Sequence, residues 1–162
     1  MADQLKYDLL RGSVLASELS DDECALLADL ITVCNLADGQ ILVDEGESDN
    51  HIHVVMDGVL GVAKQSKPEG KWVNLHVLTK GDLAGELAFM DGSPHYAALR
   101  ATGPTRVFSL EREKLESLLD EHPWTVYRVM RAIFRVVHGI LNRMAVQTSE
   151  LTNYIFKQHG KY

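Results

Sequence analysis

Seven of the nine glycines from residue 39 to residue 103 separate short apolar runs, and they strongly limit what this chain of 162 residues can fold into. They are Gly39, Gly46, Gly58, Gly70, Gly81, Gly92 and Gly103. The short apolar runs between them are strand candidates, at residues 41–43, 51–56, 59–64, 72–78, 97–102 and 105–110. Short strands that alternate with turn residues are typical of a sandwich or a barrel. We therefore predict a mostly β domain.

Helical patterns flank this block on both sides. Residues 4–19 read as a small helix and a turn, and Ser20 and Glu23 form a capping box that opens a second helix. After the strands, residues 111–121 read as a short helix, and Pro123 suits the first turn of the next one. With 46% hydrophobic and 24% charged residues, the composition fits one globular domain with a real core.

The last helix carries two apolar series. One series is Val126, Val129, Ile133, Val136 and Ile140, and it stops early; we expect it to pack on the barrel. The other runs the length of the helix with alternate spacings of three and four, from Tyr127 through Thr148 to Ile155. It is too long to bury on one barrel, so we predict a homodimer through a parallel coiled coil. The predicted interface residues are Met130, Phe134, Val137, Leu141, Met144, Leu151 and Ile155.

The segment from residue 85 to residue 100 carries the chemistry. Gly85 and Glu86 open a short apolar turn, which the residues 91–94 break, and a run of small residues follows. Free backbone N–H groups at the start of such a turn can seat an anion. The carboxylate of Glu86 beside that seat would accept hydrogen bonds from a neutral hydroxyl group, such as that of a sugar.

This segment resembles the phosphate-binding cassette of the cyclic nucleotide-binding domain. Gly85, Glu86, Leu87, Ala88 and Phe89 match the first half of the family pattern in order. The second half departs from it: His95 stands where the family has an arginine, and Tyr96 where it has a small residue, before Ala97 fits again. The turn glycines extend the resemblance over about residues 10–145, and it implies a jelly-roll-like β-barrel.

The resemblance also implies a ligand site under the last helix, with a lid near Ile140 and Leu141. The residues that it places around the cavity are Gly85, Glu86, Leu87, Ala88, His95, Tyr96 and Ala97. An arginine holds phosphate through two charged donors, whereas histidine is mostly neutral at pH 7 and offers at best one. We therefore expect cyclic AMP and cyclic GMP to bind weakly or not at all. A different, less charged ligand stays open, and no other cofactor is indicated.

Several partner classes are disfavoured. In the bacterial regulators of this family, such as the catabolite activator protein, a helix-turn-helix domain follows the last helix, but here only residues 157–162 remain, so no DNA-binding function carries over. A net charge of −7 also disfavours nucleic acid. No apolar run approaches the roughly 20 residues that span a bilayer. Cys24 and Cys34 read as reduced core thiols near the helical pattern, which is typical of a cytoplasmic protein.

The expected organisation is a barrel with N-terminal helices at residues 1–122, a long helix at 123–157 and a tail at 158–162. We predict a non-catalytic sensor or regulatory module, acting through its own dimer or an unidentified protein partner. Two alternatives stay open: a scaffold with a vestigial pocket, and a cupin-like metal-dependent enzyme. The latter would use His51 and His53, two apart on one strand face, with Asp57 as a carboxylate, but a third histidine in a matching motif is missing. No arrangement of a catalytic nucleophile and base is indicated, and no metal site is predicted.

Overall fold

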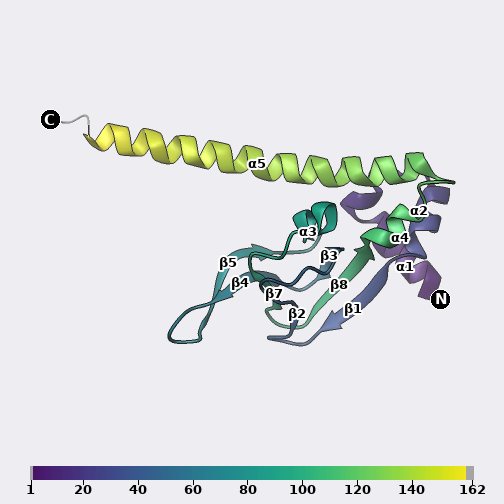
Figure 1. Ribbon diagram of the computed structural model, residues 1–162, viewed down its shortest axis with the longest axis horizontal. Coiled ribbons are helices and arrows are strands. Elements are labelled where there is room, and N and C mark those ends of the chain that lie inside the picture. Colours follow the sequence, from purple (N-terminus) through teal and green to yellow (C-terminus); the bar gives the residue numbers. More distant parts are fainter. Residues whose placement is uncertain (1, 160–162) are drawn as a thin grey trace.

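A computed structural model describes residues 2–159, and it shows a β-sandwich with helices at one end and a long helix above it (Figure 1). The eight strands are β1 (Thr32–Leu36), β2 (Ile41–Val43), β3 (His51–Asp57), β4 (Leu60–Gln65), β5 (Trp72–Leu78), β6 (Leu83–Ala84), β7 (Ala98–Ala101) and β8 (Thr105–Glu111). They form two antiparallel sheets, in the orders β1-β8-β3-β6 and β2-β7-β4-β5. The predicted fold class, mostly β with flanking helices, is confirmed.

The helices lie where the sequence places them. They are α1 (Ala2–Arg11), the 3-10 helix η1 (Val14–Ala16), α2 (Asp21–Ala28), α3 (Glu86–Asp91), α4 (Arg112–Glu116) and α5 (Pro123–His159). Ser20 caps α2, and both hydrogen bonds of the predicted capping box with Glu23 form. The last helix begins at Pro123 as expected and continues through residue 159, while residues 160–162 of the predicted tail lie outside the described residues.

The seven glycines all adopt positive φ angles, which side chains with a Cβ atom rarely do. Gly58 shows the strictest requirement, because a Cβ atom there would lie 2.4 Å from the carbonyl oxygen of Pro104. The glycine pattern therefore marks real turns, and these turns set the ends of the strands.

Two strands were not predicted. The segment that contains Cys34 forms β1, which pairs with β8 over the register from Thr32↔Ser109 to Leu36↔Thr105. Cys34 therefore lies in a strand and not in or near a helix. The short strand β6 pairs with β3 directly before the cassette. Both strands depend on partners far away in the sequence, so their local pattern is weak.

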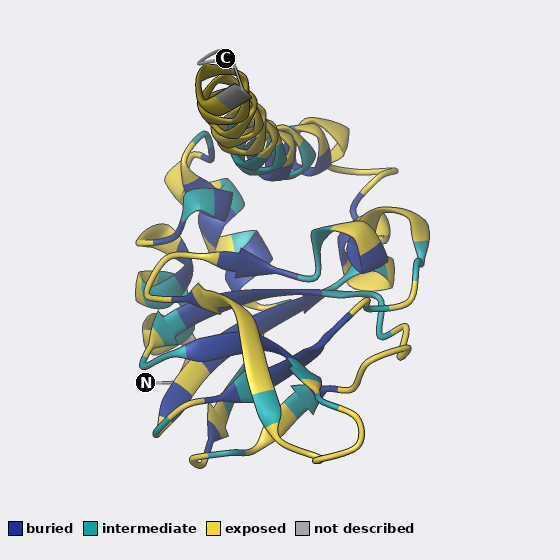
Figure 2. Cartoon of the chain, turned by 90° about the vertical axis from the view of Figure 1, so that its left-hand side faces the viewer, coloured by how far each residue is buried: buried dark blue, intermediate teal, exposed yellow. Residues whose placement is uncertain are grey.

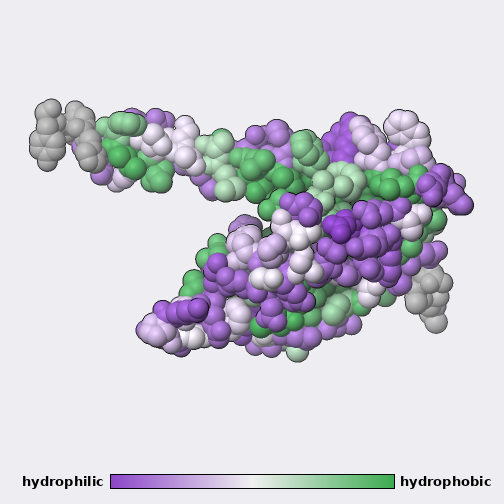
Figure 3. Space-filling view, in the orientation of Figure 1, coloured by the Kyte–Doolittle hydropathy of each residue, from purple (hydrophilic) through white to green (hydrophobic). Residues whose placement is uncertain are grey.

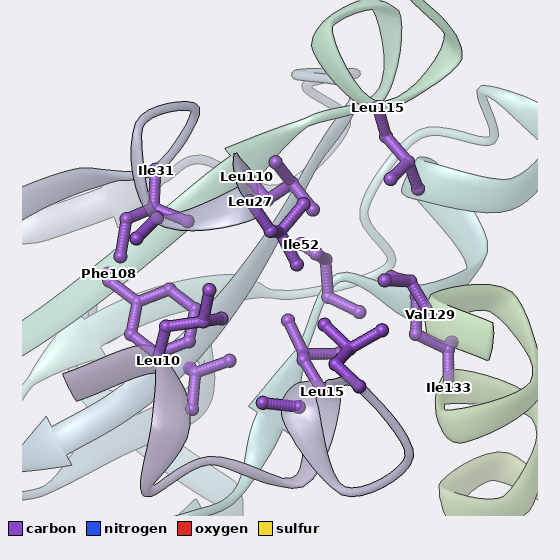
Figure 4. Close-up of a cluster of buried hydrophobic side chains, with 14 of the residues drawn as sticks. Leu10, Leu15, Leu27, Ile31, Ile52, Phe108, Leu110, Leu115, Val129 and Ile133 are labelled. Carbon is purple, nitrogen blue, oxygen red and sulfur yellow. The ribbon is translucent and has the colours of Figure 1, made fainter. Parts of the chain in front are cut away.

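The sheets and helices enclose two apolar cores. Successive residues of β8 alternate between them, with Val107 in the smaller core between the sheets and Phe108 in the larger one. The larger core joins the sheet to the N-terminal helices and to α5 (Figure 4), through residues that include Leu10, Leu15, Leu27, Ile52 and Ile133.

Only the first part of α5 packs against the rest of the chain. Val126, Val129 and Ile133 are buried in the larger core, as the early apolar series predicts. Residues 141–158 are all exposed. Figure 2 looks nearly along α5 and shows its buried residues on the side that faces the sandwich. Within residues 2–159, no helix is both long enough and apolar enough to cross a membrane.

Candidate functional site

The cassette is built by two glycines around the short helix α3. Gly85 precedes the helix with φ 82° and Gly92 follows it with φ 74°. Gly85 also sits in a tight space, since a Cβ atom would lie 2.8 Å from the carbonyl oxygen of His51 and 3.2 Å from Cε1 of His95. Position 85 therefore needs glycine for both its backbone angle and its contacts, and it lies directly against the ring of His95.

His95 points inward, and its partner is a carboxylate. Its Nε2 atom lies 2.9 Å from Oδ1 of Asp49, and the side chain is only 7% exposed. The other carboxylate oxygen of Asp49 lies 2.7 Å from Nε2 of His53. One carboxylate thus joins the cassette to strand β3. Sequence reasoning missed Asp49, which lies in a polar loop without any local motif.

The network continues from His53. Its Nδ1 atom lies 2.7 Å from the hydroxyl oxygen of Ser109 on β8. The ring of His51 stacks on that of His53, with centroids 5.9 Å apart, and its Nδ1 atom bonds the carbonyl oxygen of Asp49. Asp49, His53 and Ser109 are the residue types of a hydrolase triad, but Ser109 is buried within the sheet. Its hydroxyl group therefore serves this network and not a substrate.

The charge state of the network follows from Asp49. Burial opposes ionisation, but hydrogen bonds from His53 and His95 outweigh it and hold the pKa of Asp49 well below its usual range. An ionised carboxylate only accepts hydrogen bonds, so the Nε2 atoms of both histidines carry protons. The ionised carboxylate of Asp49 therefore places a negative charge between the two rings.

Hydrogen bonds join the loop of residues 44–50 to Gly92 and His95 of the cassette. The amide of Gly46 donates to the carbonyl oxygen of His95 over 2.7 Å, and the amide of His95 donates to that of Glu47 over 2.8 Å. The hydroxyl group of Ser48 donates to the carbonyl oxygen of Gly92 over 2.6 Å. The position of Asp49 against His95 is thus fixed by the backbone on both sides.

The remaining predicted site residues point in different directions. Glu86 is half-buried near His95, and burial raises its pKa although His95 and His76 act in the opposite sense. Ala88 and Ala97 are buried, whereas Leu87 and Tyr96 are exposed, Tyr96 by 64%. Arg100 is the arginine nearest to His95 in the sequence. Its guanidinium carbon lies 5.4 Å from the centroid of the Trp72 ring. The structure therefore brings Gly85, Glu86 and His95 together.

Comparisons with known proteins bear on this geometry. A model of the cyclic nucleotide-binding domain matches residues 33–122, which is more than half of the chain. The chain belongs to the cyclic nucleotide-binding domain family. The cAMP-dependent protein kinase regulatory subunit of Dictyostelium discoideum is 26% identical over 143 residues, which cover 86% of this chain and 42% of that protein. The chain thus spans less than half the length of this curated relative.

Solved structures of cyclic nucleotide-binding domains share the fold. One from Methylobacillus flagellatus superposes with a TM-score of 0.76 at 20% identity, covering 88% of this chain and 81% of that one. The regulatory subunit of a cAMP-independent protein kinase A from Trypanosoma brucei superposes with a TM-score of 0.65 at 20% identity, covering 99% of this chain and 52% of that one.

The two histidines of the cupin-like alternative share a strand face, as expected, but are otherwise engaged. Both ring nitrogens of His53 have hydrogen-bond partners, and one of those of His51 does. Among residues 2–159, no group of three or more His, Cys, Asp or Glu side chains is placed to hold a metal ion. Both histidines instead lie next to the cassette, since a Cβ atom at Gly85 would lie 2.8 Å from the carbonyl oxygen of His51 and 3.5 Å from Cδ2 of His53.

The predicted interface residues on α5 fall into two sets. Met130 and Val137 are partly buried against the larger core of their own chain. The other five are exposed: Phe134, Leu141, Met144, Leu151 and Ile155. Figure 3 shows hydrophobic residues along the part of α5 that extends past the sandwich.

Proposed function

We propose that this member of the cyclic nucleotide-binding family is a non-catalytic regulatory module that acts as a homodimer and binds cAMP and cGMP weakly or not at all at neutral pH. One observation carries the ligand part of the proposal. His95, at the position of the family's arginine, is buried and uses one of its two nitrogens on Asp49.

The magnitude of the missing contact supports weak binding. Hydrogen bonds to charged groups contribute roughly 1.5–3 kcal/mol each, and an arginine makes two of them to one phosphate. Losing about 3 kcal/mol corresponds to a more than hundredfold increase in Kd. Beside a neutral imidazole, the negative charge of Asp49 repels an anion and so does not replace the missing guanidinium.

One of the similar structures comes from a protein kinase whose description bears on the proposed weak binding. The kinase regulatory subunit from Trypanosoma brucei keeps this fold and is described as cAMP-independent. The curated relative from Dictyostelium discoideum is a regulatory subunit, which supports a regulatory and not a catalytic role.

The dimer rests on the exposed part of α5. A continuous apolar stripe on a projecting helix is the kind of surface that marks an interface. Its spacing of three and four residues suits a second, identical helix lying alongside.

Calorimetry with cAMP and cGMP at about pH 7.5 tests the ligand part. We expect no binding in the micromolar range for the natural chain, and micromolar Kd values would contradict the proposal. The double variant His95→Arg/Tyr96→Ser should gain affinity, because a guanidinium has five donors and can hold Asp49 and a phosphate at once. Tyr96→Ser alone is the matched control: it removes bulk but adds no charge, and we expect little gain from it.

A further inference from the structure

His95 has one nitrogen left after it binds Asp49. Its Nδ1 atom makes no hydrogen bond within residues 2–159, and every buried side-chain nitrogen or oxygen atom there has a partner. Nδ1 is therefore not fully buried. A Cβ atom on Gly85, the residue before the first turn of α3, would lie 3.2 Å from Cε1 of this ring. Nδ1 is bonded to Cε1 and therefore lies near the start of the segment that the family resemblance implies as the anion site.

We propose that Asp49 is the positioning residue that allows His95 to hold an anion in its protonated form, so that each anion bound at the cassette is accompanied by the uptake of one proton. This inference rests on the proposed function, because it explains when the weakened cassette regains an anion. The cassette would therefore bind a phosphate group at acidic pH but not at neutral pH.

The protonated ring would act at both of its nitrogens. A carboxylate on one imidazole nitrogen fixes the tautomer and stabilises the imidazolium ion. Nε2–H would keep its bond to Asp49, and the new proton on Nδ1 would be donated to the anion. Asp49 remains ionised in moderate acid, since its hydrogen bonds hold its pKa well below the usual range.

The carboxylate supports the anion more than it repels it. Asp49 lies 2.9 Å from the charged ring. An anion beyond Nδ1 would lie about 7 Å from the carboxylate, since the ring and two hydrogen bonds separate them. Coulomb energy falls as the inverse of distance. At one dielectric constant, the attraction between Asp49 and the charged ring therefore exceeds the repulsion between Asp49 and the anion by about twofold.

Other ionisable groups face this ring from the surrounding elements. His53 on β3 shares the carboxylate, and His51 stacks on His53. Glu86 on α3 interacts electrostatically with both His95 and His76 of β5. Because burial raises the pKa of Glu86, mild acid also weakens the negative charge that this residue presents to an anion.

The test measures cAMP binding by calorimetry between about pH 7.5 and 5.5. A cyclic phosphodiester keeps one negative charge over this range, whereas a phosphate monoester titrates near pH 6 and would confuse the result. We expect affinity to rise as the pH falls, by up to tenfold per pH unit, because one proton is taken up with each anion. Titrations in buffers of different ionisation enthalpy should count about one proton taken up per nucleotide.

Three variants distinguish a role of Asp49 in positioning and charging His95 from a role in folding alone. His95→Gln cannot take up the proton, so it should remove most of the pH dependence and leave only the smaller part that comes from Glu86. Asp49→Asn should move the rise in affinity to lower pH, with about tenfold weaker binding at pH 6. Ser48→Ala is the control: it loses the bond to Gly92 that fastens the same loop, but no charge, so the position of the rise should not change. Thermal melts at each pH check folding.

Each result decides the matter. Tighter binding by Asp49→Asn at every pH would show that Asp49 competes with the anion, and this would overturn the inference. Binding that is independent of pH, or no binding by the natural chain even at pH 5.5, would also overturn it. No binding at any pH leaves the proposed function intact, whereas micromolar binding at pH 7.5 overturns the proposed function. If Asp49→Asn fails to fold, His95→Gln still tests whether proton uptake by this ring drives anion binding.

Discussion

Both halves of α5 carry apolar residues, but these residues meet different surroundings. In the first half, Val126, Val129 and Ile133 are buried in the larger core. In the second half, residues 141–158 are all exposed, including Leu141, Met144 and Leu151. Helical periodicity therefore identifies apolar faces, but it does not say which face the chain itself can cover.

Polar contacts reinforce this contrast. Glu23 of α2 bonds Thr125 and Arg128, and Glu18 pairs with Arg131 and Arg135. These ties end at residue 135. The first half of α5 is thus part of the domain, while the second half is a surface that projects from it.

Ile133→Ala should give the largest effect and tests the first half of this contrast. Ile133 is buried in the larger core, so its truncation should lower the free energy of unfolding by about 2–5 kcal/mol. Val146→Ala on the projecting half is the control and should stay within about 0.5 kcal/mol. Urea unfolding of both variants measures the difference. Equal losses would mean that α5 does not dock as described.

Leu141→Glu tests the second half. Leu141 is 58% exposed in the chain, so the charge should not disturb the fold. In a paired seam it would be buried without a partner, and dimer affinity should fall by at least about tenfold. Sedimentation at micromolar concentration should show the natural chain as a dimer and the variant as a monomer.

Val146→Glu is the matched control for this experiment. Val146 is 57% exposed, but five residues further along it lies about 140° around the helix, outside the seam. It should leave the dimer intact. A monomeric natural chain, or equal behaviour of the two variants, would refute the proposed interface.

Local sequence signals predicted the parts of the fold that depend on near neighbours. The capping box of Ser20 and Glu23, the start of α5 at Pro123 and the turn at Gly58 each follow from a few adjacent residues, and all three are confirmed. Strand β1 was missed because its identity comes from β8, about 70 residues away. Pairing over such a distance leaves little trace in the local pattern.

The cassette shows the same limit at the level of chemistry. The sequence indicated that His95 replaces an arginine, and hence that a charge is missing. It did not indicate Asp49, since a carboxylate in a polar loop normally faces solvent. Only the fold brings Asp49 and His95 together, and this contact changes what the histidine can do.

The smallest expected effect concerns the tie between α2 and the docked half of α5. Burial alone would raise the pKa of Glu23, but hydrogen bonds from Ser20, Thr125 and Arg128 outweigh it and lower the pKa. An acid with a lowered pKa stabilises the fold above its unfolded pKa of about 4.5, and this contribution is lost as the pH falls through the folded value. Glu23→Gln keeps one acceptor oxygen for the capping box. Its amide nitrogen cannot accept the bonds that Thr125 and Arg128 donate to the other carboxylate oxygen, so the variant loses these bonds together with the charge. It should cost about 1–2 kcal/mol at pH 7, and the difference from the natural chain should shrink below pH 4.5. Urea unfolding of both proteins from pH 7 to pH 3.5 measures it. A constant difference across this range would show that the charge of Glu23 does not help to hold α5.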